Sequence, residues 1–172
     1  MTRPAPEDGA DLHDLIEACP PLDRNSRYCN LLQVSHFAET CVLARSSEGA
    51  LLGSVSGYLK PEEPGCVFVW QVAVHPDGRG RGLAVSMLHE LLARPACRSA
   101  RYFETTIEAD NAASWRLFER VARDLDAPRT TRVAFDRSEH FAGQHNTEML
   151  LRVGPFRPPG ESSRATSGTP PG

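Results

Sequence analysis

A turn rich in glycine and arginine, GRGRG over residues 78–82, carries the first chemical signal in the sequence. It follows an apolar run, 67–74, that is typical of a core strand, and it precedes the spacing of an amphipathic helix. Backbone N–H groups at such a turn lie free at a helix N-terminus, where the helix dipole favours anions. The end of a core strand is also a common ligand site in α/β sheets. The stretch therefore predicts a cradle for a phosphate or pyrophosphate.

Two familiar phosphate-binding patterns fail at this turn because of their spacing. Gly80 and Gly82 could open GxGxxG, but Val85 occupies the closing position. A Walker loop ends in a glycine followed by lysine, and no lysine follows Gly82. The pattern that remains is Arg79-x-x-Gly82-x-Ala84, in which small residues let the backbone approach a ligand.

This pattern resembles the [QR]xxGx[GA] signature of the GCN5-related N-acetyltransferases (the GNAT superfamily), which bind acetyl-CoA. Taken alone, the hexapeptide also fits a solvated arginine-rich turn. The resemblance implies that backbone N–H groups of the turn hold the coenzyme pyrophosphate, with contacts from Arg79, Gly80, Arg81, Gly82, Leu83 and Ala84. It also implies that Val72 and Val74 pair with the pantetheine arm, and that the Val72 N–H donates to the thioester oxygen.

A second segment, Asn111-x-x-Ser114-x-x-Leu117-Phe118, resembles the N-x-x-[AS]-x-x-L-[YF] helix of the same superfamily. The resemblance implies that Asn111, Ser114 and Phe118 line the coenzyme. A tyrosine at the last position often protonates the departing thiolate, but Phe118 has no proton to give. Helix capping by Asn111 and core packing of Phe118 are the structural alternatives, and we expect Phe118 to pack.

Four flanking segments, 21–41, 68–76, 104–114 and 140–156, resemble a narrower family, the L-2,4-diaminobutyrate acetyltransferases. These enzymes make the Nγ-acetyl precursor of the osmolyte ectoine. The resemblance implies an acyltransferase that uses acetyl-CoA as co-substrate, needs no metal, forms no covalent enzyme intermediate and assembles as a homodimer. An acetyltransferase for another small amine (a polyamine, amino acid or aminoglycoside) and a non-catalytic acetyl-CoA-binding module remain alternatives.

Diaminobutyrate carries two ammonium groups and one carboxylate, so its site needs anions and a donor group. Among the acidic residues Asp23, Glu104 and Glu148, we expect Asp23 and Glu148 to meet the ammonium groups. The alternative is that both carboxylates are simply solvated, or that Asp23 stabilises a turn. The other substrate candidates are Arg24, Asn25 or His145 for the carboxylate, Trp70 as an aromatic wall, and Thr105.

The reaction needs a neutral amine, whose pKa of about 10.4 must fall toward ~7, at ~1.36 kcal/mol per unit. Partial desolvation of the ammonium group and transfer of its proton to a base would give the neutral amine. Glu148 and His145 are the candidates for this base, and the sequence does not choose between them.

Composition excludes several other classes of protein. The 172 residues, 40% apolar and 24% charged, predict one globular domain, and the net charge of −3 offers no footprint for nucleic acid or anionic membrane. No apolar run approaches the ~20 residues of a membrane span, and we expect no signal peptide. The five cysteines lack CxxC spacing and the histidines lack HxxxH, which predicts reduced cytoplasmic thiols and no metal site.

These residues must be positioned by strands and helices whose order along the chain predicts an α/β fold with a mixed sheet and helices on both faces. The resemblance implies that this is the GNAT fold. The domain is expected over 1–156, followed by a disordered Pro/Gly/Ser-rich tail over 157–172. The strand–helix–strand unit over 66–107 should join parallel strands. Strands are expected over 3–5, 40–45, 51–59, 66–74, 101–107, 131–135 and 147–153. Helices are expected over 8–19, 83–94 and 110–125, the last capped by Asp110. The segment 22–37 should be a loop or a short helix, and 60–65 a loop.

Overall fold

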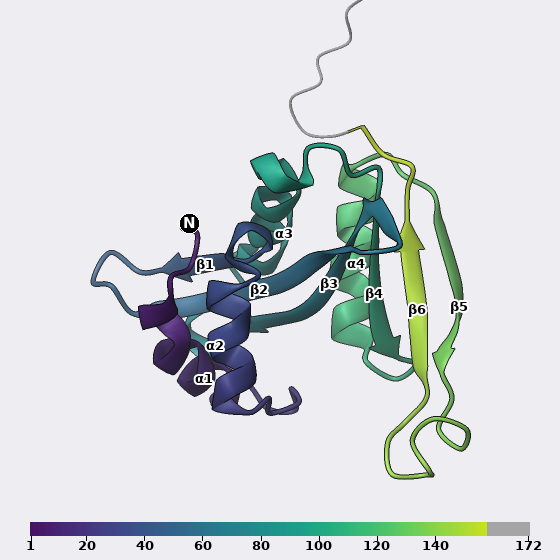
Figure 1. Cartoon of the computed structure of the whole chain (residues 1–172), viewed down its shortest axis with the longest axis horizontal. Helices are drawn as coiled ribbons and strands as arrows, with labels where there is room; N and C mark the ends of the chain where they lie inside the picture. The colour runs from purple at the N-terminus through teal and green to yellow at the C-terminus, as the bar shows by residue number, and fades with distance from the viewer. Residues whose placement is uncertain (158–172) are drawn as a thin grey trace, which may run out of the picture.

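A computed structural model describes residues 1–157, which form a mixed sheet in the order β1-β2-β3-β4-β6-β5 (Figure 1). The strands are β1 (Val42–Arg45), β2 (Leu51–Lys60), β3 (Glu63–Val74), β4 (Tyr102–Glu108), β5 (Arg129–Phe135) and β6 (Glu148–Val153). The helices are α1 (Gly9–Glu17), α2 (Arg27–Ser35), α3 (Leu83–Ala93) and α4 (Ala112–Asp124). None of these helices has the length and apolarity needed to cross a membrane. The tail predicted from 157 lies, beyond its first residue, outside the described residues.

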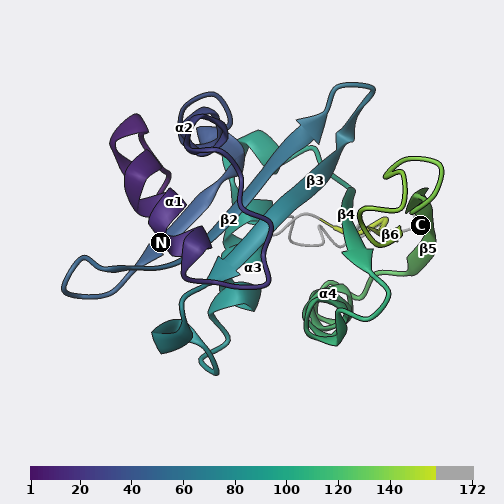
Figure 2. The same cartoon turned by 90° about the horizontal axis from the view of Figure 1, so that it is seen from below.

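The helices cover both faces of the sheet, as expected. Figure 2 shows α1 and α2 on one face and α3 and α4 on the other. The larger core cluster lies on the α3 and α4 side and includes Leu88, Phe103 and Phe118. A smaller cluster joins α1 and α2 to the sheet through Leu15 and Ala73. Apolar residues at helical spacing predicted the buried faces of α1, α3 and α4, because each helix buries one stripe.

Two predicted boundaries are wrong. The expected strand 3–5 is absent from the described chain: Thr2 makes only an isolated bridge to Leu43. The expected loop 60–65 is mostly strand, since β2 runs to Lys60 and β3 begins at Glu63. The register shifts between Leu59 and Lys60, so the proline and glycine at 64–65 lie in a bulge, where a missing N–H is tolerated.

The parallel crossover is confirmed, but the pairing it produces is short. β3 and β4 pair in parallel over only three residue pairs, from Cys66↔Tyr102 to Phe68↔Glu104. Phe68↔Glu104 is the last of these pairs, and Figure 1 shows β3 and β4 diverging. Trp70 is an extra residue in β3, because Ser56 pairs with Gln71 while its neighbour pairs with Val69. Because a bulge bends its strand, the bulge at Trp70 bends β3 close to the point where β3 and β4 stop pairing.

Candidate active site

The gap between the diverging strands is a cleft of about 260 Å³. β3 and β4 form its walls, and the N-terminal half of α4, the segment after α1 and the start of β6 also border it. Its lining includes Leu22, Asp23, Asn25, Trp70, Gln71, Val72, Thr105, Thr106, Ile107, Glu108, Asn111, Ser114, Phe118 and Glu148. Half of the predicted site residues therefore meet in this cleft.

Gln71 fixes the segment after α1 to the cleft. Its Oε1 accepts from Asn25 Nδ2 at 3.1 Å, and its Nε2 donates to the Asp23 carbonyl oxygen at 3.0 Å. The bulge at Trp70 shifts the alternation of β3, so Gln71 faces this segment while Val72 packs toward α3 and α4. Gln71 was not among the predicted site residues, since strict alternation along β3 would place its side chain on the opposite face.

Acidic groups and one histidine gather where the cleft meets the segment between β5 and β6. His145 Nε2 lies 3.7 Å from Asp23 Oδ2 and 3.6 Å from Glu108 Oε1. Asp23 and Glu148 line both the cleft and the adjoining hollow that contains His145. Glu108 was also missed. It shares a strand face with Glu104 and Thr106, and that period of two was the signal that could have found it.

Glu148 and His145 are electrostatically distinct. Burial raises the pKa of Glu148, and although the nearby His145 opposes this, Glu108 adds to it. Its Oε2 is buried without a hydrogen-bond partner in the described chain. The pKa of His145 is also raised. The largest cause is the Asn146 carbonyl oxygen, which accepts a hydrogen bond from Nδ1 at 2.9 Å. Burial opposes this shift, and the surrounding carboxylates add to it. Glu148 is thus a stronger proton acceptor than an exposed carboxylate, and the surroundings of His145 stabilise its protonated ring.

The predicted coenzyme residues lie at the cleft and at the turn that follows β3. β4 makes no pairs with β3 beyond Phe68 in the described chain, so this edge is open beside Val72. Gly80 and Gly82 have φ of +74° and +71°, and a Cβ added at either would meet nothing within 4 Å. Positive φ and open space suit a turn whose N–H groups face a phosphate.

Arg79 bends back toward the strand. Its Nε donates to the Val74 carbonyl oxygen at 3.2 Å, which secures the turn against the end of β3. Arg81 is exposed, and Leu83 and Ala84 begin α3, whose N-cap is Gly82. The turn is therefore open at its glycines and secured at Arg79, which suits the predicted contact with a pyrophosphate.

Three predictions about single residues have different outcomes. Asn111, not Asp110, caps α4, since its Oδ1 accepts from Ser114 N at 3.0 Å. Phe118 is buried with its ring 6.0 Å from that of Phe103, so the packing prediction is confirmed although it also lines the cleft. Arg24 is exposed and does not line the cleft. The structure does not bring it to the predicted carboxylate site.

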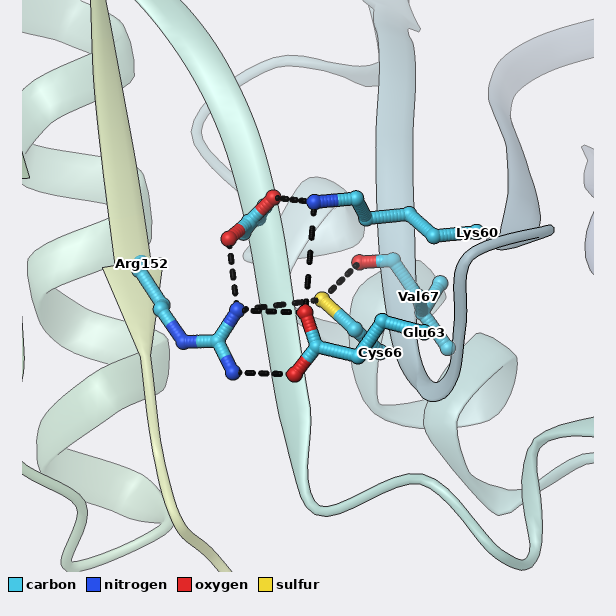
Figure 3. Close-up of polar contacts among 6 residues, drawn as sticks. Lys60, Glu63, Cys66, Val67 and Arg152 are labelled. Atoms are coloured by element: carbon cyan, nitrogen blue, oxygen red, sulfur yellow. Dashed lines mark hydrogen bonds and ion pairs between the residues drawn. The ribbon is translucent and has the colours of Figure 1, made fainter.

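Glu104 is committed to an ionic network with Lys60 and Arg152, which Figure 3 labels. Its two carboxylate oxygens lie 2.6 Å from Lys60 Nζ and 2.6 Å from Arg152 Nη1. Arg152 also bonds Glu63 and lies over the Tyr102 ring, 4.0 Å from its centroid. Glu104 is thus a structural residue, and the substrate candidates among the acids reduce to Asp23 and Glu148.

Known proteins resemble the chain along most of its length. The acetyltransferase (GNAT) family model matches residues 10–122. The L-2,4-diaminobutyric acid acetyltransferase of Methylotuvimicrobium alcaliphilum is 53% identical over 157 residues, 91% of either chain. That of Vibrio cholerae is 49% identical, covering 88% of this chain and 87% of its own.

One solved structure combines a similar sequence with a similar fold. The diaminobutyrate acetyltransferase of Paenibacillus lautus was solved in complex with its substrate L-2,4-diaminobutyric acid and coenzyme A. It is 37% identical, covers 90% of this chain and 93% of its own, and superimposes with a TM-score of 0.85.

Proposed function

The chain belongs to the GNAT family of acetyltransferases, and from that premise we propose that it acetylates the γ-amine of L-2,4-diaminobutyrate with acetyl-CoA. One observation carries this proposal. Asp23 and Glu148 line a cleft that the open edge of β3 also borders, and His145 lies in the hollow that adjoins it. The two carboxylates can therefore bind the ammonium groups of a small diamine, and the His145 ring its carboxylate, beside the strand that receives the coenzyme arm.

Acetyl-CoA supplies the acetyl group as a thioester. The turn from Arg79 to Gly82 and the N-terminus of α3 receive the pyrophosphate through backbone N–H groups, with Leu83 and Ala84 in the first helical turn. The backbone of Val72 and Val74 pairs with the pantetheine arm, and the Val72 N–H donates to the thioester oxygen. Asn111, Ser114 and Phe118 border the arm from α4.

The substrate occupies the acidic end of the cleft. Asp23 and Glu148 receive the two ammonium groups, and Trp70, 43% exposed in the cleft wall, packs against the aliphatic chain. Asn25 and the cationic His145 face the carboxylate, a role that exposed Arg24 does not share. Thr105 is buried in the β4 wall, where its hydroxyl borders the substrate.

Glu148 serves as the base that deprotonates the γ-ammonium group. Its pKa is raised by burial, so it accepts a proton more readily than an exposed carboxylate. His145 is a poor candidate, because its surroundings favour the protonated ring. The neutral amine attacks the thioester carbonyl directly, with no covalent enzyme intermediate.

The setting of the reaction is part of the proposal. The product enters ectoine biosynthesis, the protein is cytoplasmic, and it is a homodimer. All five cysteines are free, which suits a reducing compartment. β5 is an edge strand with Val133 49% and Phe135 46% exposed, and such an edge is suited to association with a second copy.

Release of coenzyme thiol from acetyl-CoA, measured with a panel of amines, tests this function. Diaminobutyrate should release thiol rapidly, and putrescine, which lacks the carboxylate, should do so poorly. Faster release with putrescine would favour a polyamine acetyltransferase of the same fold. Thermal stabilisation by acetyl-CoA without thiol release for any amine would favour a non-catalytic binding module.

A further inference from the structure

Glu108, the last residue of β4, joins the cleft to the segment between β5 and β6. Its Oε2 accepts a hydrogen bond from Asn146 Nδ2 at 2.7 Å, and its Oε1 lies 3.6 Å from His145 Nε2. These partners follow Glu108 by almost forty positions in the chain. One carboxylate therefore contacts two neighbouring residues of a distant segment.

That segment, 136–147, has internal hydrogen bonds that give it a defined shape. The Asp136 N–H donates to His140 Nδ1 at 2.9 Å, and the Arg137 N–H donates to Thr147 Oγ1 at 3.0 Å. These bonds do not attach the segment to the cleft wall. The bond between Glu108 and Asn146 does, because Glu108 belongs to the β4 wall.

The contacts of His145 determine where its protons lie. Nδ1 is 2.9 Å from the Asn146 carbonyl oxygen, and since a carbonyl only accepts, Nδ1 carries a hydrogen. In a neutral ring, Nε2 would then present a lone pair to the carboxylates of Asp23 and Glu108. The doubly protonated ring instead directs an N–H toward them. Asp23, Glu108 and Glu148, from three different segments, all favour this cation.

We propose that Glu108 is a positioning residue for the acetyl transfer, which anchors Asn146 and holds His145 as a cation beside the cleft. This inference rests on the proposed function. A cationic His145 cannot take the proton of the substrate ammonium, so that role stays with Glu148. His145 instead presents a positive charge to the substrate carboxylate.

The variant Glu108→Gln separates the charge from the hydrogen bond, since its amide oxygen can still accept from Asn146. We expect the titration of the His145 ring, followed by ¹H–¹⁵N NMR, to move about one unit lower in pH. The KM for diaminobutyrate should rise about tenfold, and the KM for acetyl-CoA should not change. Glu62→Gln, in the exposed turn between β2 and β3, is the matched control and should alter neither quantity.

An unchanged His145 titration and an unchanged KM for diaminobutyrate in folded Glu108→Gln overturn the inference. Should that variant fail to fold, Asn146→Ala tests the anchor, and an unchanged KM again overturns it. A wild-type protein that transfers no acetyl group to diaminobutyrate overturns the proposed function instead. The NMR titration then still decides whether Glu108 holds His145 as a cation.

Discussion

Lys60, at the end of β2, reaches past β3 to Glu104 in β4, with 2.6 Å between Nζ and Oε2. Arg152 of β6 binds the other oxygen of the same carboxylate. This junction lies at Phe68↔Glu104, the last pair before β3 and β4 separate. The buried carboxylate therefore fixes the point from which the cleft opens.

Glu104→Gln should destabilise the fold strongly. The amide has nearly the same shape but leaves Lys60 and Arg152 without their shared negative charge, so we expect the free energy of unfolding to fall by about 3 kcal/mol. Denaturant unfolding followed by circular dichroism measures this. Arg3→Ala breaks an ion pair with Glu39 whose side chains are both more than half exposed, and it should change the midpoint little. Equal midpoints for the two variants would contradict a stabilising role for Glu104.

The same network predicts sensitivity to acid. Burial alone would raise the pKa of Glu104, but the hydrogen bonds from Lys60 and Arg152 outweigh it and lower the pKa. A carboxyl with a lowered folded-state pKa contributes stability that is present above its unfolded pKa of about 4.3 and lost as the pH falls through the folded value. Thermal melting of the wild type should therefore decline in acid more steeply than that of Glu104→Gln. Parallel declines would count against this.

Gly82→Ala should weaken coenzyme binding beyond its effect on stability. Gly82 has φ of +71°, where a Cβ costs about 1–2 kcal/mol. Gly49, in the turn between β1 and β2, has φ of +90° and equally open surroundings, so Gly49→Ala is a matched control. Both variants should lose similar stability, and only Gly82→Ala should raise the Kd of coenzyme A in calorimetry. An equal Kd for the two would place the pyrophosphate elsewhere.

Sequence patterns predicted the turn and the helix that carry the candidate coenzyme residues because their signals are local. The turn from Arg79 to Ala84 and the helix starting near Asn111 each depend on one short segment, and each lies where spacing predicted it. The order of strands and the parallel crossover also follow from local periodicity and chain order. The burial of Phe118 was expected for the same reason.

The substrate side was harder to predict because it depends on tertiary contacts. An acid in a strand looks the same in sequence whether it lines the cleft, as Glu148 does, or is neutralised by Lys60 and Arg152, as Glu104 is. The extra residue in β3 reverses its alternation and brings Gln71 to Asn25, which strict periodicity cannot foresee.

Glu148→Gln should remove the base. We expect kcat/KM for diaminobutyrate to fall about a hundredfold or more. In the wild type, kcat/KM should decline as the pH falls through the raised pKa of Glu148, because the protonated acid accepts no proton. That decline should be absent in the variant. Glu139→Gln, at an exposed position between β5 and β6, controls for loss of charge near the cleft. A pH profile of unchanged shape in Glu148→Gln would assign the base to another group.

The position of the transferred acetyl group tests the proposed reaction most directly. The protein is incubated with acetyl-CoA labelled with ¹³C in the acetyl group and with L-2,4-diaminobutyrate, and the product is examined by NMR and mass spectrometry. Acetyl transfer to the γ-nitrogen, with one coenzyme thiol released per product formed, is the predicted result. Acetylation of the α-nitrogen, or thiol release without any acetylated diaminobutyrate, would contradict it.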